Sequence, residues 1–205
     1  RWDKQYKATL EQQNFDEINN AINQQKDLVV LPETAFTTAL NRNENLLQKL
    51  KELSFKIDII TGALYVENNQ IYNASYHFTK GQIQIAKKVV LVPFGEEIPF
   101  PKFIVDFINK VFYNGAQDYS KASEPTDFVI KGEKFRNAIC YEATTDKIFE
   151  NLGNTEYMVA ISNNAWFTPS IEPTLQHLLL KYYSKKYDVN IYHVANGSSN
   201  RIYRP

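Results

Sequence analysis

This 205-residue sequence is poor in the residues that build several common kinds of site. A single cysteine, Cys140, excludes a disulfide bond within the chain. Three histidines, His77, His177 and His193, lack the spacing of metal ligands, so we expect no metal site. The 7 glycines form no phosphate-binding loop. We therefore expect the protein to use no cofactor.

Net charge and long apolar runs are also lacking. With 23 basic and 23 acidic residues the formal net charge is +0, which gives no support to nucleic acid as a partner. No apolar run approaches the roughly 20 residues of a membrane-spanning helix. The opening residues RWDKQYKATLEQQ are too polar for a signal peptide. The sequence predicts a soluble chain whose length suits one domain over residues 1–205.

Apolar residues are present in patterns that alternate between helix and strand. Four segments have the spacing of an amphipathic helix, the first of them opened by a capping box of Asn14 and Glu17: residues 14–22, 43–54, 144–152 and 172–187. Two pairs of strand-like segments are predicted to form hairpins, 57–67 with 71–79 and 127–131 with 134–139. Three further short strands are predicted at residues 28–31, 157–162 and 190–195. This alternation predicts a layered α/β domain.

The segment VPFGEEIPFPKFIVDFINKVFYNGAQ is unusual in its prolines and aromatic residues. Within residues 99–113, Phe103, Phe107 and Ile108 belong to an apolar face with helical spacing. One interpretation is a helix that faces the core. The other is a lid that touches lipid beside a pocket.

Cys140 lies between the strand-like run KFRNAI and the helix expected near residues 144–152. One interpretation is a small buried core residue. The other is a nucleophile at the carboxyl end of a strand, where α/β sheets usually carry their sites. In that case we expect a nearby helix N-terminus to lower the pKa of the thiol.

A nucleophilic thiol needs a base and a group that stabilises an oxyanion. Glu33 follows a buried strand in the turn LPE, where burial would raise its pKa toward that of a useful base. A glutamate after a strand can also be a solvated loop residue. Lys87 and Lys88 precede the strand-like run VVLVP, and either ammonium could stabilise an oxyanion. The residues alone do not distinguish the two lysines.

Glu, Lys and Cys in this order, each at a strand end, resemble the catalytic residues of the nitrilase or carbon–nitrogen hydrolase superfamily. The motifs LPETA, KVVLVPFGEEIP, ICYE and SNNAWFTPSIEPTLQH are more narrowly similar to the periplasmic domain of apolipoprotein N-acyltransferases. That family usually reads SNDAWF, so Asn164 here replaces an aspartate. The resemblance implies a four-layer α-β-β-α sandwich that lacks the family's first strand and its segment after Pro205, within a larger membrane protein.

The resemblance also implies roles for the matching residues. Glu33 would be the general base and Cys140 the nucleophile. Lys88, rather than Lys87, would be the catalytic lysine, because the family places it three residues before LVPFGE. The family needs further residues around these three, and they match Glu96, Tyr141, Glu142 and Trp2. We expect Glu142 to position the thiol or the lysine, with a solvated side chain as the alternative.

The activity implied is transfer of a fatty acyl chain from a phospholipid to the N-terminal amine of a lipid-modified cysteine on a bacterial apolipoprotein. The reaction would be ping-pong, through a thioester on Cys140. The setting implied is the periplasmic face of the inner membrane, in a monomer held by transmembrane segments outside this chain. One alternative is a soluble amidase of the superfamily, with water in place of the amine. A non-catalytic lipid- or protein-binding module is disfavoured, because all the catalytic positions are filled.

Overall fold

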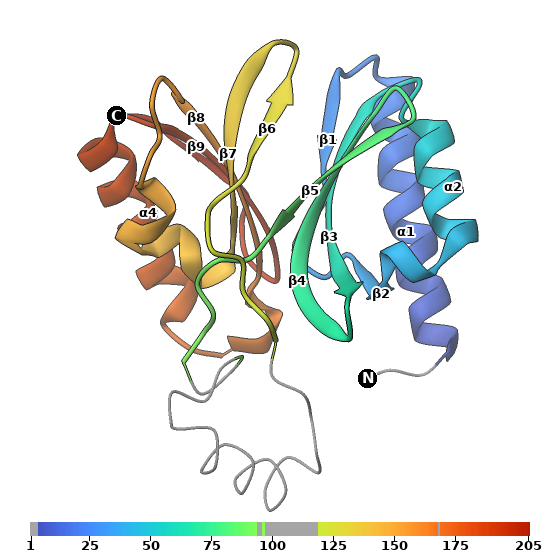
Figure 1. Cartoon of the computed structure of the whole chain (residues 1–205), viewed down its shortest axis with the longest axis horizontal. Coiled ribbons are helices and arrows are strands. Elements are labelled where there is room, and N and C mark those ends of the chain that lie inside the picture. Colours follow the sequence, from blue (N-terminus) through green and yellow to red (C-terminus); the bar gives the residue numbers. More distant parts are fainter. Residues whose placement is uncertain (1–3, 94–95, 97–118, 168) are drawn as a thin grey trace, which may run out of the picture.

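The computed structural model describes residues 4–93, 96, 119–167 and 169–205. Two sheets face each other, and helices cover their outer faces (Figure 1). These four layers form the α-β-β-α sandwich that the resemblance implies, and they fit the layered α/β domain that the alternating pattern predicts. Trp2 and the expected lid residues Phe103, Phe107 and Ile108 lie outside the described residues, and their roles stay predictions.

The N-terminal part of the chain builds the first sheet and its helices. The elements in chain order are α1 (Lys4–Asn23), β1 (Leu28–Val30), β2 (Phe36–Ala39), the 3-10 helix η1 (Leu40–Arg42), α2 (Glu44–Leu53), β3 (Asp58–Glu67), β4 (Gln70–Thr79) and β5 (Gln82–Lys87). The sheet order is β1-β3-β4-β5, and β2 also pairs with β3. The predicted hairpin is confirmed as β3 and β4, which turn at Asn68 and Asn69, both with positive φ as a tight hairpin turn requires.

The sequence predicts the start of α2 correctly but not the start of α1. α1 begins at Lys4, well before the capping box expected at Asn14, so that prediction is wrong. Asn14 lies inside the helix, and its side-chain amide donates to the carbonyl oxygen of Ala35 at 2.7 Å. α2 starts where the sequence predicts, because the Asn43 side chain accepts from the N–H of Leu46 at 3.2 Å. None of the helices in the described part of the chain is long and apolar enough to cross a bilayer.

The C-terminal part of the chain builds the second sheet. Its elements are β6 (Asp127–Ile130), β7 (Glu133–Ile139), the 3-10 helices η2 (Cys140–Thr144) and η3 (Asp146–Phe149), β8 (Tyr157–Asn163), the 3-10 helix η4 (Asn164–Phe167), α4 (Glu172–Tyr187), β9 (Asn190–Asn196) and β10 (Arg201–Tyr203). The sheet order is β10-β9-β8-β7-β6, with β7, β8 and β9 parallel. Parallel strands end at one edge of a sheet, so Cys140 after β7 and Asn163 at the end of β8 meet there.

The helix predicted near residues 144–152 is wrong, because the chain forms two short 3-10 helices around this region instead. The buried guanidinium of Arg136 contacts the backbone at the end of this region. It donates to the carbonyl oxygens of Ile148 at 2.6 Å and Glu150 at 2.9 Å, and to the carboxylate of Asp127. The carbonyl group of Ile148 is then not free to accept from the amide four residues later, as an α-helix requires. Glu150 has extended backbone, with φ −65° and ψ 143°, so an α-helix cannot continue through it.

Apolar clusters fill the spaces between the layers, and β8 contributes to two of them. Val159 and Ile161 pack between the sheets, whereas Met158 and Ala160 pack with Leu180 of α4. This alternation follows from the two-residue period of a strand. Burial of a valine, isoleucine, leucine or methionine side chain of this kind stabilises the fold by roughly 1.5–3 kcal/mol. One face of β8 therefore points toward the first sheet and the other toward α4.

Candidate active site

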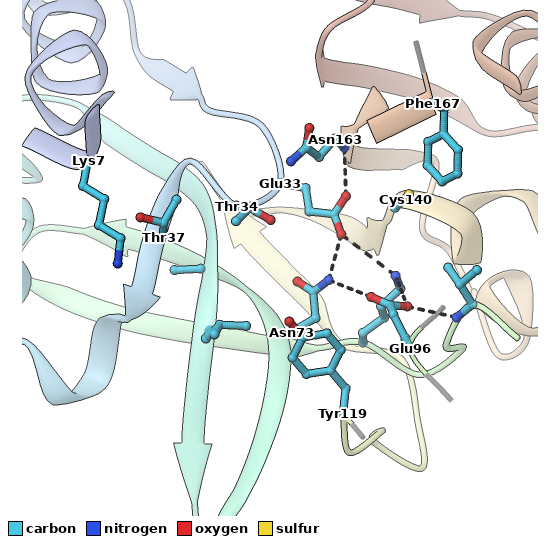
Figure 2. Close-up of a pocket in the computed structure, with 14 residues that line it drawn as sticks. Lys7, Glu33, Thr34, Thr37, Asn73, Glu96, Tyr119, Cys140, Asn163 and Phe167 are labelled. Atoms are coloured by element: carbon cyan, nitrogen blue, oxygen red, sulfur yellow. Dashed lines mark hydrogen bonds and ion pairs between the residues drawn. The ribbon is translucent and has the colours of Figure 1, made fainter. Parts of the chain in front are cut away.

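A cavity of about 470 Å³ lies at the edge where β7 and β8 end. Its wall combines residues of both sheets: Lys7, Glu33, Thr34, Thr37, Ala63, Leu64, Asn73, Lys88, Val92, Glu96, Tyr119, Cys140, Asn163 and Phe167. Figure 2 shows Phe167 near Cys140, with Lys7 and Thr37 on the other side of Glu33. The structure thus brings together the three residues that the resemblance implies as base, lysine and nucleophile.

The carboxylate of Glu33 is held by two hydrogen bonds. Its Oε1 accepts from the side-chain amide of Asn73 at 2.7 Å, and its Oε2 accepts from the backbone N–H of Asn163 at 2.8 Å. Glu33 is only 7% exposed, so the alternative of a solvated loop residue is wrong. Burial raises the pKa of Glu33, and the Lys88 ammonium and the Asn73 amide oppose this shift without cancelling it. A raised pKa suits a general base near neutral pH.

The two candidate lysines are separated by their surroundings. Lys88 is fully buried; its Nζ donates to Oε2 of Glu96 at 2.7 Å and lies 4.0 Å from Oε1 of Glu33. Burial alone would lower the pKa of Lys88, but these two carboxylates outweigh it and raise the pKa, which keeps the ammonium charged. Lys87 instead pairs with Glu67 in a partly exposed ion pair. β5 ends at Lys87, so the strand precedes Lys88 and the strand expected after it is wrong.

Asn73 is a site residue that the sequence does not indicate. Its side-chain Nδ2 lies 2.7 Å from Oε1 of Glu33 and 3.1 Å from Oε1 of Glu96. Its backbone carbonyl oxygen accepts from the N–H of Lys88 at 2.9 Å. Asn73 therefore ties the two carboxylates and the lysine to β4. The sequence could have indicated Asn73 only as a polar residue within a strand expected to be buried. Ser75 and His77 of the same strand have the same property, so it does not single out Asn73.

Cys140 begins η2 directly after β7, with a φ of 55°. This left-handed conformation costs an L-residue roughly 1–2 kcal/mol and turns the chain sharply out of the sheet. Burial and then the charge of Glu33 raise the pKa of the thiol, and the opposing effect of Lys88 is smaller. The expected lowering by a helix N-terminus is therefore wrong. A thiol with a raised pKa keeps its proton at neutral pH, so it would need a neighbouring base in order to act as a nucleophile.

Glu142 connects the segments that carry the nucleophile and the lysine. Its Oε1 accepts from the N–H of Ile139 at 2.7 Å, and its Oε2 accepts from the N–H of Val89 at 2.8 Å. The side chain is 1% exposed, so the solvated interpretation is wrong. Burial raises the pKa of Glu142 to about 7. Because its partners directly precede Cys140 and directly follow Lys88, the carboxylate holds both in place through the backbone.

The remaining predicted residue, Tyr141, lies outside the cavity wall. Its side chain is 39% exposed, and its role stays a prediction. The wall includes Lys7 of α1 and Thr37 of β2, neither of which the sequence indicates. Among the described residues, no group of three His, Cys, Asp or Glu side chains is arranged to hold a metal ion.

Comparison with known proteins places this geometry in a family. The model of the carbon–nitrogen hydrolase family matches residues 4–196. The apolipoprotein N-acyltransferases of Wolinella succinogenes and Helicobacter pylori are 48% and 42% identical to this chain, each over 100% of it. The matches cover 49% and 48% of those two proteins. The chain thus spans about half the length of the curated relatives that it matches.

Solved structures share the fold at much lower identity. Nit3 of Saccharomyces cerevisiae, a member of branch 10 of the nitrilase superfamily, matches with a TM-score of 0.68 and 19% identity over 97% of this chain and 77% of that chain. An amidase from Nesterenkonia sp. matches with a TM-score of 0.72 and 11% identity, over 97% of this chain and 77% of that chain. The matched residues and the shared sandwich together show that this chain belongs to the carbon–nitrogen hydrolase family.

Proposed function

We propose that this chain is the catalytic domain of an apolipoprotein N-acyltransferase. One observation carries the proposal: Glu33, Lys88 and Cys140 arrive from three distant segments and line a single cavity. The 48% identity to a relative of that name over the whole chain supports the same activity. The acyl donor would be a phospholipid and the acceptor a bacterial apolipoprotein. The domain would work at the periplasmic face of the inner membrane, held by segments outside this chain.

In the first half-reaction, Glu33 takes the thiol proton while the sulfur of Cys140 attacks the ester carbonyl of the phospholipid. A C–S bond forms, and the carbonyl electrons move to oxygen. The ammonium of Lys88, which gives one hydrogen bond to Glu96, has further N–H groups to stabilise this oxyanion. Such a contribution is about 3 kcal/mol. The oxyanion collapses, the C–O bond breaks, and the departing lysophospholipid takes the proton from Glu33.

In the second half-reaction, the amine of the lipid-modified cysteine attacks the thioester on Cys140. Glu33 takes a proton from the attacking nitrogen, and Lys88 again stabilises the oxyanion. The C–N bond forms, the C–S bond breaks, and the sulfur leaves with the proton returned by Glu33. The products are an amide on the apolipoprotein and a free thiol, so the domain is ready for another cycle.

The apolar part of the cavity wall supports a lipid substrate. Ala63, Leu64 and Val92 line the cavity with Phe167, whose side chain is 39% exposed. Ile171, four residues beyond Phe167, is 73% exposed. An acyl chain that leaves water for such a surface gains about 0.8 kcal/mol for each buried CH₂ group.

The second candidate is hydrolysis of a carbon–nitrogen bond, with water in place of the amine. The sandwich that this chain shares with the Nesterenkonia amidase favours it. The same base, lysine and nucleophile would serve both reactions, so the substrate distinguishes them.

The test is the intact mass of the full-length protein after incubation with phospholipid vesicles. We expect a gain of one acyl chain on Cys140 and none in Cys140→Ala. Addition of a diacylglyceryl-cysteine peptide should remove the adduct and yield the N-acylated peptide. An adduct that persists in Cys140→Ala contradicts the proposal, and ammonia release from amides without any acyl adduct favours the amidase.

A further inference from the structure

Behind β8, on the side that faces α4, lies a buried polar cluster that the proposed chemistry does not use. Its members are at most 3% exposed: Ser162, Asn164, Gln176 and His193. They lie beside apolar residues that fill the rest of the layer, such as Met158. A polar group buried there costs free energy unless it is hydrogen-bonded, so the contacts within the cluster matter.

Gln176 of α4 is the centre of the cluster. Its Oε1 accepts from Nδ2 of Asn164 at 2.9 Å, and its Nε2 donates to Oγ of Ser162 at 3.3 Å. One amide group therefore binds both residues that flank Asn163 along the chain. The alternation of β8 explains the geometry, because Ser162 continues the face toward α4 whereas Asn163 lines the cavity.

We propose that Gln176 is a positioning residue for Glu33: by holding Ser162 and Asn164 it fixes the backbone amide of Asn163 that donates to the glutamate. That N–H lies 2.8 Å from Oε2 of Glu33. A peptide group whose two neighbours are both anchored cannot turn away from the carboxylate. This inference rests on the proposed function, which assigns Glu33 as the base.

Two further contacts anchor the same chain segment. Oγ of Ser162 also lies 3.0 Å from Nε2 of His193 on β9. Nδ2 of Asn164 donates a second hydrogen bond, to Oγ of Ser198, at 3.0 Å. Gly197, with a φ of 82°, allows this approach, since a Cβ atom there would lie 2.6 Å from the amide nitrogen of Ala165. The end of β8 is thus held from α4 and from the β9–β10 connection together.

The charged and titratable groups around Glu33 define what a pH measurement reports. Lys88, Glu96, Tyr119 and Cys140 interact with it from the cavity wall, which also includes Lys7. His193 lies behind β8, and burial lowers its pKa to about 4, so it stays neutral at neutral pH. The Asn163 N–H favours the carboxylate form of Glu33, so loosening this contact raises the pKa of Glu33 further.

The experiment measures the rate at which iodoacetamide alkylates Cys140 in this chain, from mildly acidic to mildly alkaline pH. Gln176→Met removes both hydrogen bonds at similar volume. We expect the rate near neutrality to fall about tenfold and the midpoint of the acidic limb to rise by about one pH unit. The matched control is Ser184→Ala, a fully buried position further along α4, which should keep the wild-type profile.

Ser162→Ala removes one of the two hydrogen bonds of Gln176 and tests the same inference if Gln176→Met does not fold. We expect the midpoint of the acidic limb to rise in Ser162→Ala by less than in Gln176→Met. An unchanged profile in a folded variant, or an equal shift in Ser184→Ala, overturns the inference. Alkylation needs no lipid. If the midpoint shifts as expected in Gln176→Met but the full-length protein transfers no acyl chain, only the proposed function is overturned. A wild-type acidic limb that persists in Glu33→Gln would overturn both proposals.

Discussion

A Cβ atom placed on Gly62 would lie 2.6 Å from the Cα atom of Glu33, far inside van der Waals contact. The same atom would lie 2.9 Å from the carbonyl oxygen of Pro32, which accepts a hydrogen bond from the N–H of Gly62 at 3.2 Å. The turn that carries Glu33 therefore rests directly on the backbone of β3. Only a residue without a side chain permits this approach.

Gly62→Ala is expected to displace Glu33 and slow acylation of Cys140 by about a hundredfold, since a shift of about 1 Å in a catalytic group costs that much. Single-turnover acylation measures the effect. The control is Gly132→Ala, where a Cβ atom meets nothing within 4 Å but φ is 88°. It should lose roughly 1 kcal/mol of folding free energy while it acylates at the wild-type rate. A wild-type rate in Gly62→Ala would show that the turn adapts.

The layered fold can be predicted from the sequence where the local pattern is strong. β3 and β4 are rich in β-branched and aromatic residues and flank an Asn-Asn turn, so local preference and tertiary structure agree. β5 is not indicated, because the more apolar run after it has the pattern of a buried strand. The short strand β10, Arg201–Tyr203, depends on its pairing with β9 rather than on any local pattern.

Residue types and motifs in the sequence predict several residues that belong to the site, but not the contacts between them. Cys140 and Glu33 stand out at the ends of strands, but Lys87 and Lys88 are equivalent in sequence and differ only in burial and partners. The contacts of Asn73 with Glu33, and of Glu33 with Asn163, join residues 40 and 130 positions apart. No local pattern encodes contacts over such distances.

Lys88→Met is expected to abolish most acylation, because it removes the cation that would stabilise the oxyanion. It also leaves the buried carboxylates of Glu33 and Glu96 uncompensated, which costs about 3–5 kcal/mol of folding free energy. Lys87→Met breaks a partly exposed ion pair with Glu67 and should cost less than about 1 kcal/mol, with activity retained. Acylation rates and urea unfolding measure both changes. A larger loss of acylation rate in Lys87→Met than in Lys88→Met would contradict the assignment of Lys88 as the catalytic lysine.

Glu142 should make folding stability depend on pH. Its pKa is about 7 in the folded chain against an ordinary value of 4.5, so the folded state binds the proton more tightly. Its favourable contribution is fully present below 4.5 and is lost as pH rises to about 7. The unfolding free energy of the wild type minus that of Glu142→Gln should fall by on the order of 3 kcal/mol over this interval. Other titrating groups cancel in the difference, and a difference independent of pH would contradict the prediction.

Ile171→Ser tests whether the exposed apolar residues that follow the cavity residue Phe167 in the chain meet lipid. Ile171 is 73% exposed at the N-cap of α4, where a serine can cap the helix, so we expect its replacement to leave the unfolding free energy unchanged or to raise it by about 1 kcal/mol. If the Ile171 side chain inserts into the membrane interface, its contact contributes roughly 2 kcal/mol to binding. Loss of this contact should slow acylation of the protein by phospholipid vesicles about tenfold or more. A short water-soluble ester does not need that contact, and its rate should not change.

The matched control for Ile171→Ser is Phe55→Ser, an equally exposed apolar position (71%) two residues beyond the end of α2, which belongs to the opposite outer layer (Figure 1). It should leave the rates with both the vesicles and the soluble ester unchanged, because it lies away from the cavity. The informative quantity is the ratio of the vesicle rate to the soluble-ester rate in each variant. A ratio that stays at the wild-type value in Ile171→Ser would show that this residue does not contact lipid during the reaction. A fall in this ratio in Phe55→Ser as large as in Ile171→Ser would show that overall surface hydrophobicity, rather than a contact made by Ile171 itself, governs access to the phospholipid.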